Sequence, residues 1–258
     1  MLEHIALVYG VSLFLAMLAC LEVGRRYGLK HERDEPEKAT AGKKIIEGAF
    51  FGLLSLLVAF SFSGAVSRFD HRRELIVNEA NDIGTAYLRV DLLAPEAQPQ
   101  MRNLFRAYLD ARLAMFHALP NLEAARQDMA RSIDLQGQIW NLAVTSTRSA
   151  GSHPEGGKLL LPAVNSMFDI SNSRTWAAVT HPPSIIYGML FLVALICAFI
   201  AGHSLAVTKP NPWLHILGFA LLISGSLYVV LEIEYPRIGF INIQKYDQAL
   251  VDVRTSMR

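Results

Sequence analysis

The chain has 258 residues, of which 52% are hydrophobic and only 18% are charged, and its formal net charge is +1. Proteins that bind nucleic acid usually carry a concentrated basic surface, so this balance predicts no nucleic-acid partner. Two cysteines are too few for a disulfide framework or a cysteine-rich zinc site. The sequence contains no phosphate loop, dinucleotide fingerprint or Gly-x-Ser-x-Gly motif. We therefore expect no enzyme, no cofactor and no metal centre.

Four apolar segments without Asp, Glu, Lys or Arg divide the chain. Each has about 17–23 residues, the length that an α-helix needs to cross about 30 Å of hydrocarbon. A soluble protein of this size has no core large enough to bury four such segments. We therefore predict an all-α integral membrane protein in contact with the lipid bilayer, with spans at about residues 5–24, 45–67, 184–207 and 212–233.

The first two spans form a predicted transmembrane hairpin over residues 1–66, and basic residues crowd the loop between them. This loop contains Arg25, Arg26, Lys30, Arg33, Lys38, Lys43 and Lys44. Short cytoplasmic loops of membrane proteins carry such an excess of positive charge. We therefore expect a multi-pass protein of the bacterial inner (cell) membrane with a cytoplasmic first loop. Both termini and the polar middle of the chain would then be extracytoplasmic.

The end of the second span places polar and aromatic residues on one helical face. Phe60, Ser63, Gly64 and Ser67 recur at steps of three, one and three residues. One interpretation is a pore wall, in which aromatic rings form a constriction and hydroxyl groups partly replace the water around an ion. The other is close packing of two spans through small residues.

Three arginines follow this face directly: Arg68, Arg72 and Arg73. As a functional feature they predict a basic collar that concentrates anions at the mouth of a pore. Anchoring to lipid headgroups, with an internal ion pair to Asp70, explains them equally well.

Residues 67–182 are expected to form an extramembrane bundle of about four helices. Ile76, Ala80, Ile83 and Tyr87 recur with helical spacing, and alternating strand patterns are absent. The second transmembrane hairpin follows at residues 183–235, and residues 236–258 are left as a C-terminal tail. The predicted architecture is therefore two transmembrane helical hairpins that flank a helical bundle.

Acidic residues suggest two further features. Glu79 and Asp82, with neighbouring asparagines, could bind a hard cation through their oxygens, although a solvated helix face also explains them. Glu232 and Glu234 close the fourth span, where a salt bridge to Arg237 is the simplest interpretation.

Several stretches together resemble the bacterial bestrophin-like membrane family. They are Phe60-Ser-Phe-Ser-Gly64, Arg68-Phe-Asp-His-Arg-Arg-Glu-Leu-Ile-Val-Asn-Glu-Ala80, Val164-Asn-Ser-Met-Phe-Asp169 and Glu234-Tyr-Pro-Arg-Ile-Gly-Phe240. Bestrophins are pentameric anion channels whose second span lines the pore with aromatic residues, and Phe60 and Phe62 are similar to these. The calcium-binding acidic cluster of bestrophins has no counterpart in this chain.

Two functions remain open at this point. The resemblance implies a homo-oligomeric channel for inorganic ions, with the second span around its axis. The arginines would favour anions and the acidic residues cations, so the sequence leaves the selectivity open. The alternative is a non-conducting sensor or scaffold that is anchored in the membrane and holds a helical binding domain outside the cell membrane.

Overall fold

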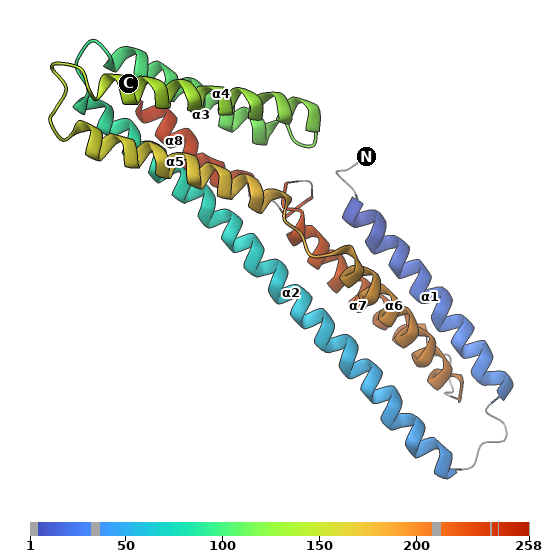
Figure 1. The fold of residues 1–258 in the computed structure, drawn as a ribbon. Helices are drawn as coiled ribbons and strands as arrows, with labels where there is room; N and C mark the ends of the chain where they lie inside the picture. The colour runs from blue at the N-terminus through green and yellow to red at the C-terminus, as the bar shows by residue number, and fades with distance from the viewer. Residues whose placement is uncertain (1–4, 32–36, 208–212, 238, 242, 258) are drawn as a thin grey trace. The chain divides into compact units, whose positions relative to one another are not determined.

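The computed structural model describes residues 5–31, 37–207, 213–237, 239–241 and 243–257 (Figure 1). Within these ranges the chain is almost entirely helical and contains no strand. It divides into two compact units, each described here by itself. Unit 1 comprises residues 1–67 and 181–235, and unit 2 comprises residues 68–180 and 236–258.

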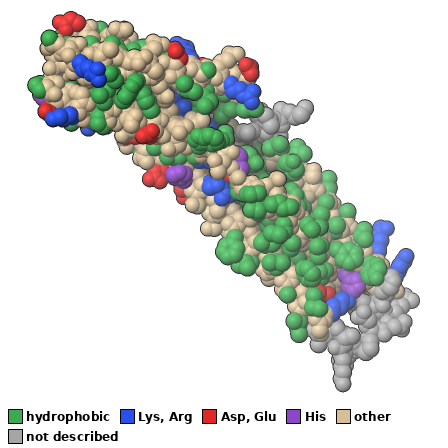
Figure 2. Space-filling view, in the orientation of Figure 1, with side chains coloured by type: hydrophobic (Ala, Val, Ile, Leu, Met, Phe, Trp, Pro, Cys, Tyr) green, Lys and Arg blue, Asp and Glu red, His purple; other side chains and the backbone are tan. Residues whose placement is uncertain are grey.

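Unit 1 contains the helices that are long and apolar enough to cross a membrane. They are α1 (Ile5–His31), the first part of α2 (Glu37–Leu88), α6 (Ser184–Ser204) and α7 (Trp213–Glu234). Figure 2 shows many hydrophobic side chains on the visible surface around α6 and α7. Such a surface is stable against lipid and unfavourable against water. The prediction of an all-α membrane protein with four spans is therefore confirmed.

Helices α1 and α6 approach so closely that glycine is required at their contact. A Cβ atom at Gly202 would lie 1.9 Å from the carbonyl oxygen of Leu21, and one at Gly24 would lie 2.1 Å from that of Phe199. Gly28 begins a second tight contact four residues later, against Ala206. Small residues at this spacing let two membrane helices pack through their backbones. The Gly24–Gly28 pair thus joins the first span to the third.

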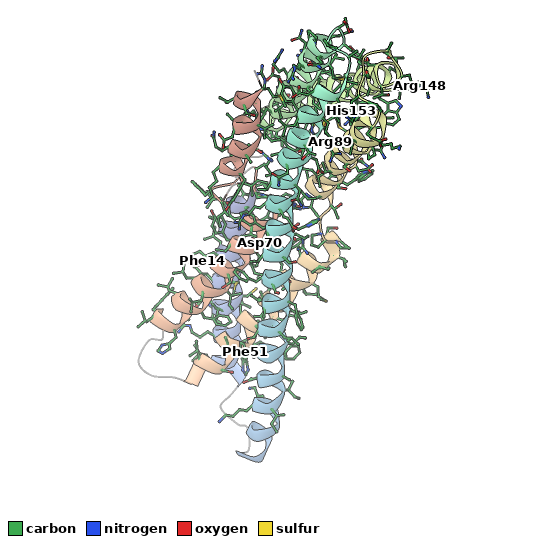
Figure 3. All side chains as sticks on the ribbon, turned by 90° about the vertical axis from the view of Figure 1, so that its left-hand side faces the viewer. Phe14, Phe51, Asp70, Arg89, Arg148 and His153 are labelled. Atoms are coloured by element: carbon green, nitrogen blue, oxygen red, sulfur yellow. The ribbon has the colours of Figure 1, made fainter. Side chains whose placement is uncertain are left out.

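Helix α2 continues from the apolar segment into the polar part of the chain without a break. Its 52 residues contain no proline, so every backbone N–H can stay in the helical ladder. Figure 3 labels two of its residues, Phe51 in the apolar part and Asp70 where the charged residues begin. The first part of the helix belongs to unit 1 and the part from Arg68 onward to unit 2.

Unit 2 is a helical bundle around its own apolar core. It contains the remainder of α2, η3 (Arg89–Leu92), α3 (Gln98–His117), α4 (Leu122–Ser146), α5 (Gly156–Val179), η5 (Gln244–Asp247) and α8 (Gln248–Ser256). Asn121 caps α4, because its side chain accepts a hydrogen bond of 3.2 Å from the backbone N–H of Ala124. The core includes Ile83, Phe105, Tyr108, Ile139, Leu160 and Val164.

The C-terminal segment belongs to this core. Leu250 is fully buried and Met257 is nearly so, and both contact the core of unit 2. Residues 236–258 are predicted from the sequence as a tail, because the nine residues of α8 are too few for a clear periodic pattern. In the structure this short helix closes one side of the bundle.

Candidate functional site

The predicted polar-aromatic face of α2 is not covered by the rest of its own chain. Phe60 is 66% exposed, Ser63 and Ser67 are exposed, and Gly64 is partly exposed. Only 6% of the apolar window of α2 is buried, against 28–44% for the other three spans. We name Phe60, Ser63, Gly64 and Ser67 the α2 membrane face.

The opposite side of α2 does pack within unit 1. Leu54 and Ala65 are buried there, and the ring of Phe51 meets the ring of Phe219 edge-on, with centroids 5.9 Å apart. One side of the second span is thus fixed by its own chain, and the α2 membrane face is left for lipid, for water or for another copy.

The three arginines beyond this face do not form one collar, because successive residues of a helix point about 100° apart. Arg72 is buried, and its guanidinium donates hydrogen bonds to the carbonyl oxygens of Ala177 at 2.9 Å and Thr180 at 3.0 Å. It thereby holds the C-terminal end of α5, where unpaired carbonyl groups collect.

Arg73 points elsewhere. It forms an ion pair of 2.7 Å with Asp70, and its guanidinium lies 4.4 Å from the ring centroid of Tyr246. The predicted internal ion pair of Asp70 is therefore confirmed. Arg68 and Arg72 share a different face of α2, one helical turn apart.

Glu79 is enclosed in the interior of unit 2 between two arginines. Its Oε1 accepts a hydrogen bond of 2.6 Å from Arg112 Nε, and its Oε2 accepts one of 2.5 Å from Arg174 Nη1. Arg174 Nη2 donates to Asp247 at 2.8 Å, and Asp247 also pairs with Arg237 at 2.9 Å. These residues link α2, α3, α5 and η5.

A single aromatic ring lies against all three of these arginines. The guanidinium carbons of Arg174, Arg237 and Arg112 lie 3.8, 4.5 and 5.2 Å from the ring centroid of Phe116. The negative face of an aromatic ring attracts a cation, and the attraction is stronger where water is excluded. We name these residues the ion-pair cluster: Glu79, Arg112, Phe116, Arg174, Arg237 and Asp247.

The ion-pair cluster contains three positive and two negative side chains, so Glu79 is essential to its charge balance. Burial alone would raise the pKa of Glu79, but the charges and hydrogen bonds of Arg112 and Arg174 outweigh burial and hold this pKa below its ordinary value. Both carboxylate oxygens already accept from guanidinium groups. The geometry therefore supports a structural ion pair at Glu79 in place of the predicted cation ligand.

Asp82 lies three residues further along α2 and is partly buried, and this burial raises the pKa of its carboxyl group. Among the residues that the structure describes, no three His, Cys, Asp or Glu side chains lie close enough together to hold a metal ion.

The salt bridge between the end of the fourth span and Arg237 stays a prediction, and the structure shows a further partner for each side. Arg237 pairs with Asp247, whereas a carboxylate oxygen of Glu234 lies 3.0 Å from His181 Nδ1. Glu234 is fully buried, and the ring of His181 lies against that of Tyr235 with centroids 4.4 Å apart. The sequence showed the charges at residues 232–237 but not their partners.

The residues that sequence reasoning missed are Arg112 and Arg174 of the ion-pair cluster. Arg112 follows Tyr108 by four residues, and Arg174 follows Met167 by seven, so both continue apolar stripes that face the core. An arginine on such a stripe predicts a buried carboxylate partner, because an unpaired buried charge is very costly. That signal was available for α3 and α5.

Comparison of the sequence with known protein families identifies the family of this chain. A family model described as a Bestrophin-like domain matches residues 11–247, which is nearly the whole chain. No curated protein and no solved structure matches it. The match includes most of the first span, the other three spans, the α2 membrane face and most of unit 2. The chain therefore belongs to the bestrophin-like family.

Proposed function

We propose that this protein is an oligomeric ion channel of the bacterial cell membrane, in which α2 of each copy lines the pore. The observation that carries the proposal is the α2 membrane face, which is polar and aromatic and which the chain itself leaves uncovered. Family membership supports it, because bestrophins are ion channels. The partners of the chain are then the lipid bilayer, inorganic ions and further copies of itself.

The polar groups of the α2 membrane face are better suited to a water-filled pore than to lipid. Ser63 and Ser67 expose their hydroxyl groups at the end of the span, and Phe60 lies one turn earlier. If this face contacted lipid tails, these hydroxyl groups could form hydrogen bonds only to the backbone of their own helix. Around a water-filled axis they can replace part of the hydration of an ion, while the phenyl rings narrow the passage.

Several copies are necessary for such a pore. The other three spans of the chain have mainly apolar surfaces, and the side of α2 that meets them carries Leu54 and Ala65. A single copy therefore provides one polar helix face, which cannot enclose a pore by itself. In a closed ring each copy would present the same face to the axis, as cyclic symmetry requires.

Orientation is part of the same proposal. Arg25, Arg26 and Lys30 lie at the end of α1, and Glu22 pairs with both arginines at 2.9 and 2.7 Å. With Lys43 and Lys44 they concentrate positive charge at one end of the first hairpin, which favours a cytoplasmic first loop. Unit 2 would then lie outside the cytoplasm.

Ion flux from liposomes tests the proposal. We expect purified protein to release a KCl gradient, and Phe60→Ala to change the flux because it removes a ring from the α2 membrane face. Phe62→Ala is the matched control. The family resemblance groups Phe62 with Phe60, but Phe62 points about 200° away from Phe60 on the same helix and lies outside the α2 membrane face. Liposomes that stay as tight as protein-free ones, together with a monomeric mass near 28.6 kDa in detergent, would contradict the channel.

The non-conducting sensor or scaffold is the second candidate, and the self-contained core of unit 2 favours it. Such a core is what a binding domain held outside a membrane requires. A protein that remains monomeric and tight in liposomes, yet binds a small molecule or partner through unit 2, would support this alternative.

A further inference from the structure

The end of unit 2 that adjoins the membrane spans exposes large apolar side chains. Trp176 and Val179, which lie on one side of α5, are 64% and 62% exposed. Trp176 points about 200° away from Arg174, which faces the interior of the unit. We propose that this end of unit 2 is a membrane-binding surface that lies in the lipid headgroup layer of the bilayer.

The depth of this surface follows from its position along α2. The apolar segment of α2 ends at Ser67, and Arg72 lies five residues later, which is about 7–8 Å along a helix. The guanidinium of Arg72 donates hydrogen bonds to the carbonyl oxygens of Ala177 at 2.9 Å and Thr180 at 3.0 Å, so the end of α5 lies at the level of Arg72. The headgroup layer on each side of a bilayer is about 5–7 Å thick, so the end of α5 is expected in it.

The path of the chain supports the same depth. Helix α6 begins at Ser184, five residues after Val179, and Ile185 in its first turn is 75% exposed, as suits a helix that meets lipid. Tryptophan is enriched at the boundary between membrane and water because its ring is apolar and its N–H group is polar. The exposed ring of Trp176 therefore suits the headgroup layer better than water.

A second segment of unit 2 brings residues of the same kind to this level of α2. The guanidinium carbon of Arg73 and the ammonium nitrogen of Lys245 lie 4.4 and 5.3 Å from the ring centroid of Tyr246. Lys245 is exposed and Tyr246 is partly exposed, and both belong to η5. Such side chains have an apolar body and a polar end, which suits a boundary between hydrocarbon and water. Helix α5 and η5 thus support the same surface independently.

Quenching of tryptophan fluorescence by brominated lipids tests the proposal on the full chain in liposomes. In a Trp213→Phe background, Trp140→Phe leaves Trp176 as the only tryptophan, and Trp176→Phe leaves Trp140. The bromine atoms are placed on the acyl chains next to the headgroups, so they quench tryptophan in or beside the headgroup layer. We expect Trp176 to lose a large part of its emission and Trp140 to lose little.

Trp140 is the matched control because it belongs to the same unit but lies away from the proposed surface. Helices α4 and α5 are antiparallel: Gln136 donates a hydrogen bond of 3.3 Å to Ser171, and a Cβ atom at Gly157 would lie 3.6 Å from that of Thr147. Trp140 lies between these two contacts on α4. It is therefore about 15–20 Å from the end of α5 that leads into α6.

Three results would overturn the proposal. Quenching of Trp176 by aqueous acrylamide but not by the brominated lipids would place it in water. Protection from both quenchers would place it against protein, such as another copy of the chain. Equal quenching of Trp140 and Trp176 by the lipids would remove the distinction between the two positions.

A second comparison decides the question if the variant with Trp140→Phe does not fold. Trp213→Phe alone is then compared with Trp213→Phe combined with Trp176→Phe. The proposal requires that lipid quenching is present in the first protein and lost in the second, and equal quenching of both would contradict it. The proposal goes beyond ion conduction and does not depend on it, so a protein without channel activity could still satisfy it.

Discussion

Replacing Glu79 by Gln should strongly destabilise unit 2. The change keeps the size of the side chain but removes one of the two negative charges that face Arg112 and Arg174, which are buried, and Arg237, which is partly buried. Arg112 would lose its carboxylate partner, and Arg174 would keep only Asp247. The amide oxygen of glutamine can accept one of the two hydrogen bonds, so charge is the main loss.

The size of the effect follows from burial. Glu79 is fully buried and Arg112 is 1% exposed, so water cannot replace the lost partner. Removing one member of a buried ion pair costs about 3–5 kcal/mol. In a protein of about 150–250 residues each kcal/mol lowers the melting temperature by about 2–4 °C, so a fall of about 6–20 °C is expected.

Tryptophan fluorescence can report this change for unit 2 alone. The chain has three tryptophans, and only Trp213 lies in unit 1, so a Trp213→Phe background leaves Trp140 and Trp176 as probes of unit 2. Glu74→Gln is the matched control, because Glu74 is exposed on the same helix. Equal melting temperatures for the Glu79 and Glu74 variants would refute the role given to the ion-pair cluster.

Two further predictions follow from packing and charge. Gly202→Ala should separate α1 from α6 and lower the free energy of unfolding by about 1–3 kcal/mol or more. Gly188→Ala is the control on the same helix: its Cβ atom meets open space, so the change should be neutral or stabilising. Melting curves in detergent measure both effects. Because the folded-state pKa of Glu79 is lowered, its contribution to stability should be complete above pH of about 4.5 and should be lost as the pH falls through the folded-state value. The free energy of unfolding should therefore fall less steeply with decreasing pH for Glu79→Gln than for the wild type. Parallel curves of unfolding free energy against pH would contradict the lowered pKa of Glu79.

The membrane architecture could be predicted from the sequence because its signals are local. Four charge-free segments of sufficient length define the spans, and the absence of proline between Phe60 and Leu93 predicts the continuous α2. The cap at Asn121 is likewise a property of neighbouring residues. Local rules of this kind need no knowledge of the tertiary fold.

The ion-pair cluster could not be predicted in the same way. Glu79 lies 33 residues from Arg112 and 95 from Arg174, and Arg174 lies 73 from Asp247. Helical periodicity shows which residues share a face, but it does not show which faces meet. The short α8 brings Leu250 into the core, but its nine residues are too few for a sequence pattern that would predict this packing.

Accessibility of the α2 membrane face to water tests the central claim most directly. Ser63→Cys, reconstituted in liposomes and treated with a water-soluble thiol reagent, should lose ion flux, because Ser63 would line the conducting axis. Phe62→Cys and the wild type, whose Cys197 is buried and Cys20 partly buried, should lose little. If Ser63→Cys conducts ions and keeps its full flux after the same treatment, this face meets lipid or protein and α2 does not line a pore.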